Sequence, residues 1–197
     1  EDHFDPDHEL ERELEAKGRQ DTLTMLRGIV PSYASCIFIR QAAPLGLGHA
    51  VLCSRPVVGD EPFFVHLADD LIDAEEACLA QMARVFEQRQ GSVLGVETVA
   101  REETNKYGIV DSEAIDERLS RVKGIVEKPK PADAPSNLAV VGRYILTPAI
   151  YAKLERIGRG AGGEIQLTDG IAALLADEAI YAYKFEGKRF DCGSKLG

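Results

Sequence analysis

The sequence has no long hydrophobic run and a deficit of basic residues. Its 23 Lys and Arg stand against 33 Asp and Glu, which gives a formal net charge of −10 at pH 7. No apolar segment is nearly as long as a membrane-spanning helix, which needs about 20 residues, and no signal-peptide pattern is present. The acidic surplus repels nucleic acid and anionic membranes, so that a small anionic ligand needs a locally positive pocket. We therefore expect no nucleic acid and no membrane among the partners.

Paired cysteines are also lacking. The four cysteines, Cys36, Cys53, Cys78 and Cys192, are far apart and form no Cys-x-x-Cys pair. This spacing argues against a zinc ribbon or a disulfide scaffold and predicts reduced thiols in a cytoplasmic protein. The sequence contains no Ser-His-Asp order and no Cys-His pair that would indicate a covalent hydrolase.

Helical and strand patterns alternate along the chain. A charged segment, 7–17, spaces Leu10 and Leu14 four apart and ends at Gly18, which predicts an amphipathic surface helix. Residues 73–76 are expected to cap a second helix, and a third is expected from about 164 to 176. Strands are predicted at 35–40, 63–67, 92–96, 124–127, 139–146 and 180–185, the second of them buried. This alternation predicts one α/β domain built on a layered sheet.

Acidic residues near strand ends are the first candidates for a ligand site. Asp69 and Asp70 follow the predicted strand 63–67, and ligands of open α/β sheets bind at the carboxyl ends of strands. Asp191 lies in a turn beside Gly193. Mg²⁺ prefers one or two such carboxylates together with substrate phosphates. Helix capping or loop solvation explains Asp69 equally well and Asp70 better.

Glycine-rich and charged segments suggest what the ligand is. The segment 158–163 contains four glycines and leads into Glu164, so the backbone there can approach a ligand closely. The segment 41–50, with Gly46 and Gly48, reads by itself as a turn before a short helix and matches neither a dinucleotide fingerprint nor a P-loop. Glu127 and Lys128 precede a proline and suit sugar hydroxyls and phosphate, although an edge-strand ion pair explains them equally well. Together these groups favour sugar-phosphate chemistry, in which positioning and charge neutralisation are the main requirements.

Six motifs occur in one order, at 40–50, 67–70, 126–129, 141–144, 163–169 and 191–195. Over essentially all 197 residues, the sequence resembles the bacterial UTP:glucose-1-phosphate uridylyltransferase family. The resemblance implies a three-layer, Rossmann-like nucleotide-diphospho-sugar transferase fold, with a mixed, mostly parallel sheet flanked by helices, in one domain over 1–197. It also implies that UTP and α-glucose 1-phosphate are converted to UDP-glucose and pyrophosphate with Mg²⁺. A homodimer or homotetramer is the implied assembly.

The resemblance assigns nucleotide and metal roles to four residues. Gln41 would read the uracil edge, and Gly46 would let the backbone approach the base. Asp69 and Asp191 would hold Mg²⁺.

Sugar and phosphate roles follow from the same motifs. Gly142 and Glu164 would line the glucose, and Glu127 would help to orient its hydroxyls. Lys128 and Lys195 would act as catalytic residues that neutralise phosphates during in-line attack on the α-phosphorus.

One departure from the family concerns the termini. Family members begin with a strand and a Gly-x-Gly-Thr-Arg loop that cradles the triphosphate, and a helix follows the position of Lys195. Neither has a counterpart here, so we expect this chain alone to be nearly inactive. The alternatives are a sugar nucleotidyltransferase for another base and a non-catalytic sugar-nucleotide-binding or assembly module. A nicotinamide-dependent oxidoreductase would lack the third glycine and would explain none of the other motifs.

Overall fold

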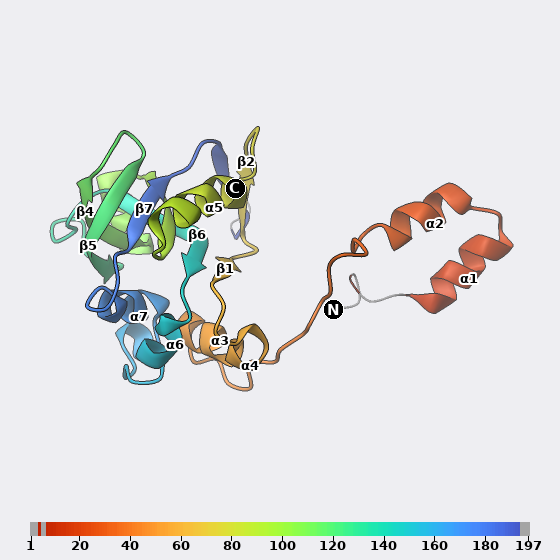
Figure 1. The fold of residues 1–197 in the computed structure, drawn as a ribbon, viewed down its shortest axis with the longest axis horizontal. Coiled ribbons are helices and arrows are strands. Elements are labelled where there is room, and N and C mark those ends of the chain that lie inside the picture. The colour runs from red at the N-terminus through yellow and green to blue at the C-terminus, as the bar shows by residue number, and fades with distance from the viewer. Residues whose placement is uncertain (1–3, 5–6, 194–197) are drawn as a thin grey trace. The chain divides into compact units, whose positions relative to one another are not determined.

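The structure is a computed structural model that describes residue 4 and residues 7–193 (Figure 1). The chain divides into two compact units, residues 1–40 and 41–197. No helix in the described ranges is long and apolar enough to cross a membrane.

The first unit is built from α1 (His8–Ala16) and α2 (Gln20–Arg27). The carboxylate of Asp7 accepts a hydrogen bond from the amide of Leu10 and caps α1, which confirms the predicted surface helix. Arg27 of α2 forms ion pairs with two glutamates of α1. The strand predicted at 35–40 is wrong, since these residues form no regular structure and Ile37 is exposed. They have hydrophobic strand formers, but a strand also needs a neighbour that completes its hydrogen bonds.

The second unit contains a six-stranded sheet in the order β1-β6-β3-β7-β5-β4. These strands are β1 (Phe63–His66), β3 (Val93–Thr98), β4 (Gly108–Ala114), β5 (Leu119–Glu127), β6 (Leu138–Leu146) and β7 (Tyr181–Lys184). A separate antiparallel pair is formed by β2 (Asp70–Asp73) and β8 (Lys188–Asp191). The helices are α3 (Leu47–Cys53), α4 (Arg55–Val58), α5 (Cys78–Arg89), α6 (Ala149–Leu154) and α7 (Leu167–Leu174), with 3-10 turns η1 (Arg101–Lys106) and η2 (Ala161–Gly163).

Helices cover both faces of the sheet. Met82 of α5 packs with Val141 and Ile145 of β6 on one face. On the other face, α3, α6 and α7 pack on a larger core that includes Leu94 and Tyr144. Side chains of successive strand residues point to opposite faces, which is why one strand serves both cores. The predicted three-layer α/β fold is confirmed.

The expected strand direction needs a correction. Among the strand pairs of the described residues, only β3 and β7 run parallel, and the others are antiparallel. The sheet is mixed as expected, but within the described part of the chain it is not mostly parallel. Strands β4 and β5 follow one another without an intervening α-helix, and such a short connection joins antiparallel neighbours.

Three local expectations also differ from the structure. The predicted helix cap at 73–76 is wrong, because Asp73 ends β2 and α5 begins only after Ala77. Strand β1 is not fully buried, since Phe64 is 49% exposed on the edge of the sheet. Helix α7 begins at Leu167 instead of about 164. In each case the hydrophobic pattern predicted the element, and packing moved its boundary or its exposure.

Candidate functional site

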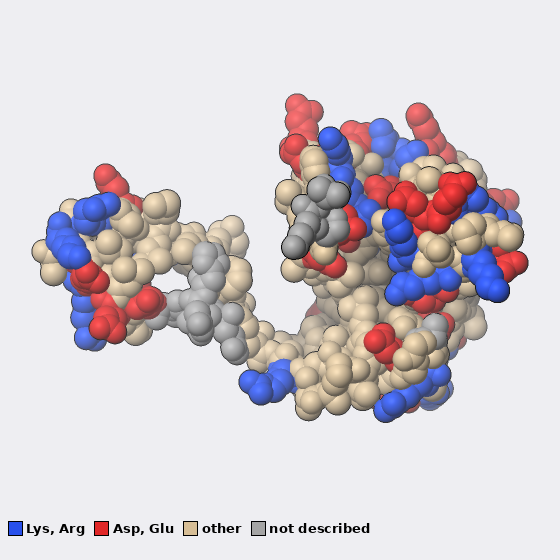
Figure 2. Space-filling model, turned by 180° about the vertical axis from the view of Figure 1, so that it is seen from behind, with Lys and Arg blue, Asp and Glu red and all other residues tan. Residues whose placement is uncertain are grey.

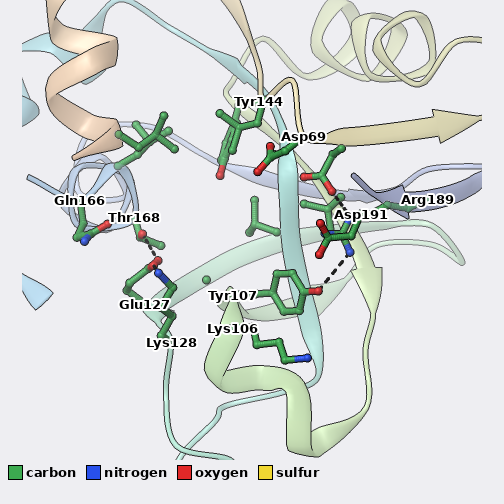
Figure 3. A pocket seen from close by; sticks show the side chains of 18 of the residues that line it. Asp69, Lys106, Tyr107, Glu127, Lys128, Tyr144, Gln166, Thr168, Arg189 and Asp191 are labelled. Atoms are coloured by element: carbon green, nitrogen blue, oxygen red, sulfur yellow. Dashed lines mark hydrogen bonds and ion pairs between the residues drawn. The ribbon is translucent and has the colours of Figure 1, made fainter. Parts of the chain in front are cut away.

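A cavity of about 400 Å³ lies in the second unit, beside the ends of β1, β5 and β8 (Figure 3). Six of the nine predicted site residues line it: Asp69, Glu127, Lys128, Gly142, Glu164 and Asp191. Lys195 lies outside the described residues. Gln41 and Gly46 do not line the cavity, although Gly46 packs directly against Glu164. The fold therefore gathers most of the predicted site from five of the six motifs.

The carboxylates of Asp69 and Asp191 converge at one end of the cavity. Asp69 follows β1, and its carbonyl oxygen accepts a hydrogen bond of 2.7 Å from the amide of Cys192. A Cβ placed on Gly193 would lie 3.1 Å from Asp191 Oδ1 and 3.7 Å from Asp69 Oδ2. The two oxygens therefore border the same small space.

This pair fits a magnesium ion better than a metal that needs an all-protein cage. The described residues contain no group of three or more His, Cys, Asp or Glu arranged to hold a metal. Mg²⁺ needs only one or two carboxylates when phosphates and water supply the rest. Within residues 7–193, the Asp69 carboxylate accepts no hydrogen bond and forms no ion pair, so its oxygens are available. Among the residues that the structure describes, Asp191 Oδ1 accepts a hydrogen bond only from the amide of Gly193, at 2.9 Å.

The neighbouring Asp70 has a different role. It is buried and pairs with Arg189, whose guanidinium also donates to Glu97 at 2.7 Å and lies over the ring of Tyr107 at 5.2 Å. Burial raises the pKa of the Asp70 carboxyl, and the hydrogen bond from Arg189 opposes that rise. Asp70 neither caps a helix nor lies in solvent, so that reading of it is wrong. Its ion pair with Arg189 joins β2 to β8 next to Asp69 and Asp191.

Gly142 holds the loop that carries Asp69. Its φ is +68°, and its carbonyl oxygen accepts a hydrogen bond of 2.9 Å from the amide of Leu67. The buried guanidinium of Arg143 donates to the carbonyl oxygens of Leu67 and Asp70. A Cβ on Gly142 would lie 2.7 Å from Asp70 Oδ2 and 3.0 Å from Leu67 Cβ. Only glycine satisfies both the backbone angle and this close approach.

We expect Gly142→Ala to lower the free energy of unfolding by about 1–3 kcal/mol, because the added methyl group overpacks the 67–70 loop. Gly162→Ala is the matched control, since Gly162 has a φ of +73° but no atom within 4 Å of its Cβ position. Urea denaturation of both variants measures the two costs. Equal destabilisation would show that only the backbone angle matters and that the contact with Asp70 does not.

Glu127 and Lys128 lie where β5 ends. The hydroxyl of Thr168 donates to Glu127 Oε2, and Lys128 Nζ lies 3.4 Å from Glu127 Oε1 (Figure 3). The backbone of Lys128 is left-handed, with φ of +44°, and its amide donates to Tyr107 at 2.9 Å. Its side chain is 56% exposed. The two residues form the expected ion pair, although β5 lies inside the sheet and not at its edge. They also border the cavity, and their binding of sugar hydroxyls and phosphate stays a prediction.

Glu164 lies in an extended segment and not at the start of a helix. The amide of Ile165 donates to Leu45 at 2.7 Å, and the amide of Gly48 donates to Ile165 at 2.9 Å. A Cβ on Gly46 would lie 2.7 Å from Glu164 Cβ. The two glycine-containing segments thus pair with each other, and this pairing delivers Glu164 to the cavity.

Six polar residues that line the cavity had no predicted role in binding or catalysis: Lys106, Tyr107, Tyr144, Gln166, Thr168 and Arg189. The hydroxyl of Tyr144 points into the cavity, although the residue is only 8% exposed (Figure 3). Tyr144 and Thr168 stand inside motifs already singled out, so inspection of every polar member would have found them. Arg189 had no local signal, because its importance comes from partners on β2 and β3.

Charge over the rest of this unit is mixed. On the face shown in Figure 2, Lys and Arg side chains are interspersed with Asp and Glu. The cavity itself combines lysines with carboxylates, which suits a ligand that brings both phosphate and a cation.

Comparison with known proteins gives a consistent family. A model of the nucleotidyl transferase family matches residues 7–195. UTP--glucose-1-phosphate uridylyltransferase of Bacillus subtilis is 49% identical over all of this chain, which covers 67% of that relative. The enzyme of the same name from Pseudomonas aeruginosa is 46% identical, with 71% of its length covered. The chain thus spans about two thirds of these relatives.

Solved structures agree. UTP-bound UGPase from Acinetobacter baumannii matches with a TM-score of 0.88 and 43% sequence identity. The match covers 98% of this chain and 68% of the Acinetobacter chain. A UDP-glucose pyrophosphorylase complexed with UDP-glucose matches with a TM-score of 0.82 and 41% sequence identity. This match covers 93% of this chain and 72% of the other. The chain belongs to the nucleotidyl transferase family, and within it to the UTP:glucose-1-phosphate uridylyltransferases.

Proposed function

We propose that this protein transfers the uridylyl group of UTP to glucose 1-phosphate, forming UDP-glucose and pyrophosphate. The observation that carries the proposal is the cavity, where Asp69 and Asp191 converge beside Glu127, Lys128 and Glu164. Relatives that this chain resembles along its whole length carry the corresponding name. We also propose that residues 1–197 belong to one nucleotidyltransferase domain, because the family match runs through both units.

The residues divide into a sugar side and a phosphate side. Glu164 and Glu127 accept hydrogen bonds from glucose hydroxyls, and Gly142 leaves room for the ring. Thr168 holds Glu127 in place from α7. Lys128 and Lys195 neutralise phosphate oxygens, so that the sugar phosphate can approach the nucleotide α-phosphorus in line. Gln41 and Gly46 contact the uracil.

Members of the family generally use a divalent metal ion. We propose Mg²⁺, held by Asp69 and Asp191. When bound, it would neutralise charge on the phosphoryl oxygens and on the departing pyrophosphate. The protein's contribution is to bring the two carboxylates together from separate loops and to keep Asp70 paired with Arg189.

We place the protein in the cytoplasm, where its proposed substrate UTP is found. Assembly as a homodimer or homotetramer stays a prediction of the family resemblance. Analytical ultracentrifugation of the purified protein measures that assembly.

Glu164→Gln tests the proposed function. The variant should weaken the use of glucose 1-phosphate by about 1–3 kcal/mol, because a sugar hydroxyl loses its charged acceptor, while binding of UTP changes little. Calorimetry with UTP and with UDP-glucose, together with pyrophosphate release where turnover occurs, separates the two effects. Glu61→Gln is the control, since Glu61 is exposed and outside the cavity.

The outcomes differ clearly. Equal losses for both substrates would show that Glu164 supports the fold. Binding of UDP-glucose without any turnover would favour the non-catalytic binding module for residues 1–197. Equal use of UTP, CTP, TTP and ATP would contradict a uridylyltransferase.

A further inference from the structure

The side-chain amide of Gln41 is tied to two neighbours. Its Nε2 lies 3.0 Å from the carbonyl oxygen of Gly46 and 2.9 Å from Nδ1 of His49. Gln41 and His49 are both half-buried, and Gly46 is the residue that packs against Glu164 of the cavity. This three-residue cluster therefore borders the site without lining it.

Hydrogen-bond chemistry fixes the orientation of the amide. A backbone carbonyl oxygen can only accept, so the Gln41 atom facing Gly46 must be the NH₂ nitrogen and not the oxygen. The same nitrogen faces His49, and an NH₂ group can only donate. Nδ1 of His49 must therefore be the unprotonated nitrogen of a neutral ring, with its proton on Nε2. Both amide hydrogens are then used inside the protein.

The carbonyl oxygen of Gln41 is what remains for a ligand. Within the described part of the chain, Oε1 accepts no hydrogen bond. Both hydrogens of this half-buried amide are already donated within the protein. The amide can therefore offer a ligand only its oxygen, as a hydrogen-bond acceptor.

We propose that His49 is a positioning residue that holds the Gln41 amide so that its oxygen accepts the N3–H of uracil. The inference rests on the proposed function, in which Gln41 contacts the base. Uracil carries a hydrogen on N3, whereas cytosine presents a lone pair there. When the amide is held in this orientation, its oxygen attracts the N3 hydrogen of uracil and repels the N3 lone pair of cytosine. If the amide were free to rotate, it could offer its NH₂ group to cytosine and selectivity would fall.

The place of His49 in the fold suits this role. It lies in the first turns of α3, and side chains on a helix lean toward the N-terminus, which here is the Gln41 side. Helix α3 is anchored by the hydrogen bond from Gly48 to Ile165. The thiol of Cys53, one turn later, lies 3.9 Å from both ring nitrogens and packs against the imidazole. The acceptor nitrogen is thus fixed relative to the segment that carries Glu164.

The test compares binding of UDP-glucose and CDP-glucose by calorimetry. His49→Leu removes the acceptor, whereas His49→Asn places a carbonyl oxygen near the position of Nδ1. We expect His49→Leu to lower the preference for UDP-glucose over CDP-glucose by about tenfold, the effect of one hydrogen bond, and His49→Asn to retain most of it. His66→Leu is the matched control, because His66 lies on β1 outside the cavity and the cluster.

The ratio of the two affinities is measured on one sample, so it does not depend on the fraction of folded protein. An unchanged ratio in His49→Leu overturns the inference. If the ratio is unchanged because both affinities fall by the same factor, His49 serves the fold alone. A wild-type protein that binds both sugar nucleotides equally also overturns it. A wild-type protein that binds neither overturns the proposed function itself.

Discussion

Replacing Asp191 by asparagine is expected to reduce Mg²⁺-dependent formation of UDP-glucose by about 10²–10³-fold. Asp191 and Asp69 border one space from two separate loops, and the amide of asparagine carries no charge to attract a cation. Removing one preorganised charge-stabilising group at a reaction centre has this magnitude. The measurement is pyrophosphate release as a function of Mg²⁺ concentration, or Mg²⁺-dependent binding of UDP-glucose where turnover is too slow to follow.

Two controls make this result specific. Asp60→Asn removes an exposed carboxylate outside the cavity and should leave both measurements unchanged. Asp69→Asn should reproduce the loss, because both residues serve one metal ion. A loss confined to Asp191→Asn would contradict the shared site. Retention of activity in both variants would remove the metal assignment altogether.

Arg189→Met is expected to destabilise the protein by about 3–5 kcal/mol. Arg189 and Asp70 have side-chain exposures of only 10% and 9%, and removing one partner of a buried pair leaves the other charge uncompensated. Arg84→Met is the matched control, because Arg84 pairs with Glu76 at an exposed site where such pairs contribute about 0–1 kcal/mol. Urea denaturation at neutral pH measures both. Equal costs would show that burial of the pair is energetically unimportant.

The cost of Arg189→Met should depend on pH. Burial already raises the pKa of Asp70, and loss of the hydrogen bond from Arg189 raises it further. A carboxyl whose pKa is higher in the folded than in the unfolded state favours folding when protonated, so stability falls as pH rises through that pKa. The variant should therefore be least destabilised at acidic pH. A cost that stays constant as pH is lowered would mean that Asp70 stays ionised and has found another partner.

Local patterns predicted the elements that have a local cause. The helix at His8–Ala16 was predicted from leucine spacing, and Asp7 caps it as a nearby carboxylate can. The strands predicted at 139–146 and 180–185 match β6 and β7 closely, because β6 is apolar and buried and β7 lies between the buried residues Ile180 and Phe185. The strand predicted at 35–40 was wrong for the opposite reason. It has the composition of a strand, but no neighbouring strand pairs with it in the described structure.

The family, the order of the motifs and the residue types at the site could all be identified without the structure. Whether a carboxylate faces a ligand or an internal partner was decided only in three dimensions. Asp69 and Asp70 are adjacent in sequence, yet one is open to the cavity while the other pairs with Arg189, 119 positions away. The orientation of the Gln41 amide likewise depends on His49 and Gly46. Burial and hydrogen-bond partners come from segments brought together by folding, and no pattern within a short stretch of sequence contains them.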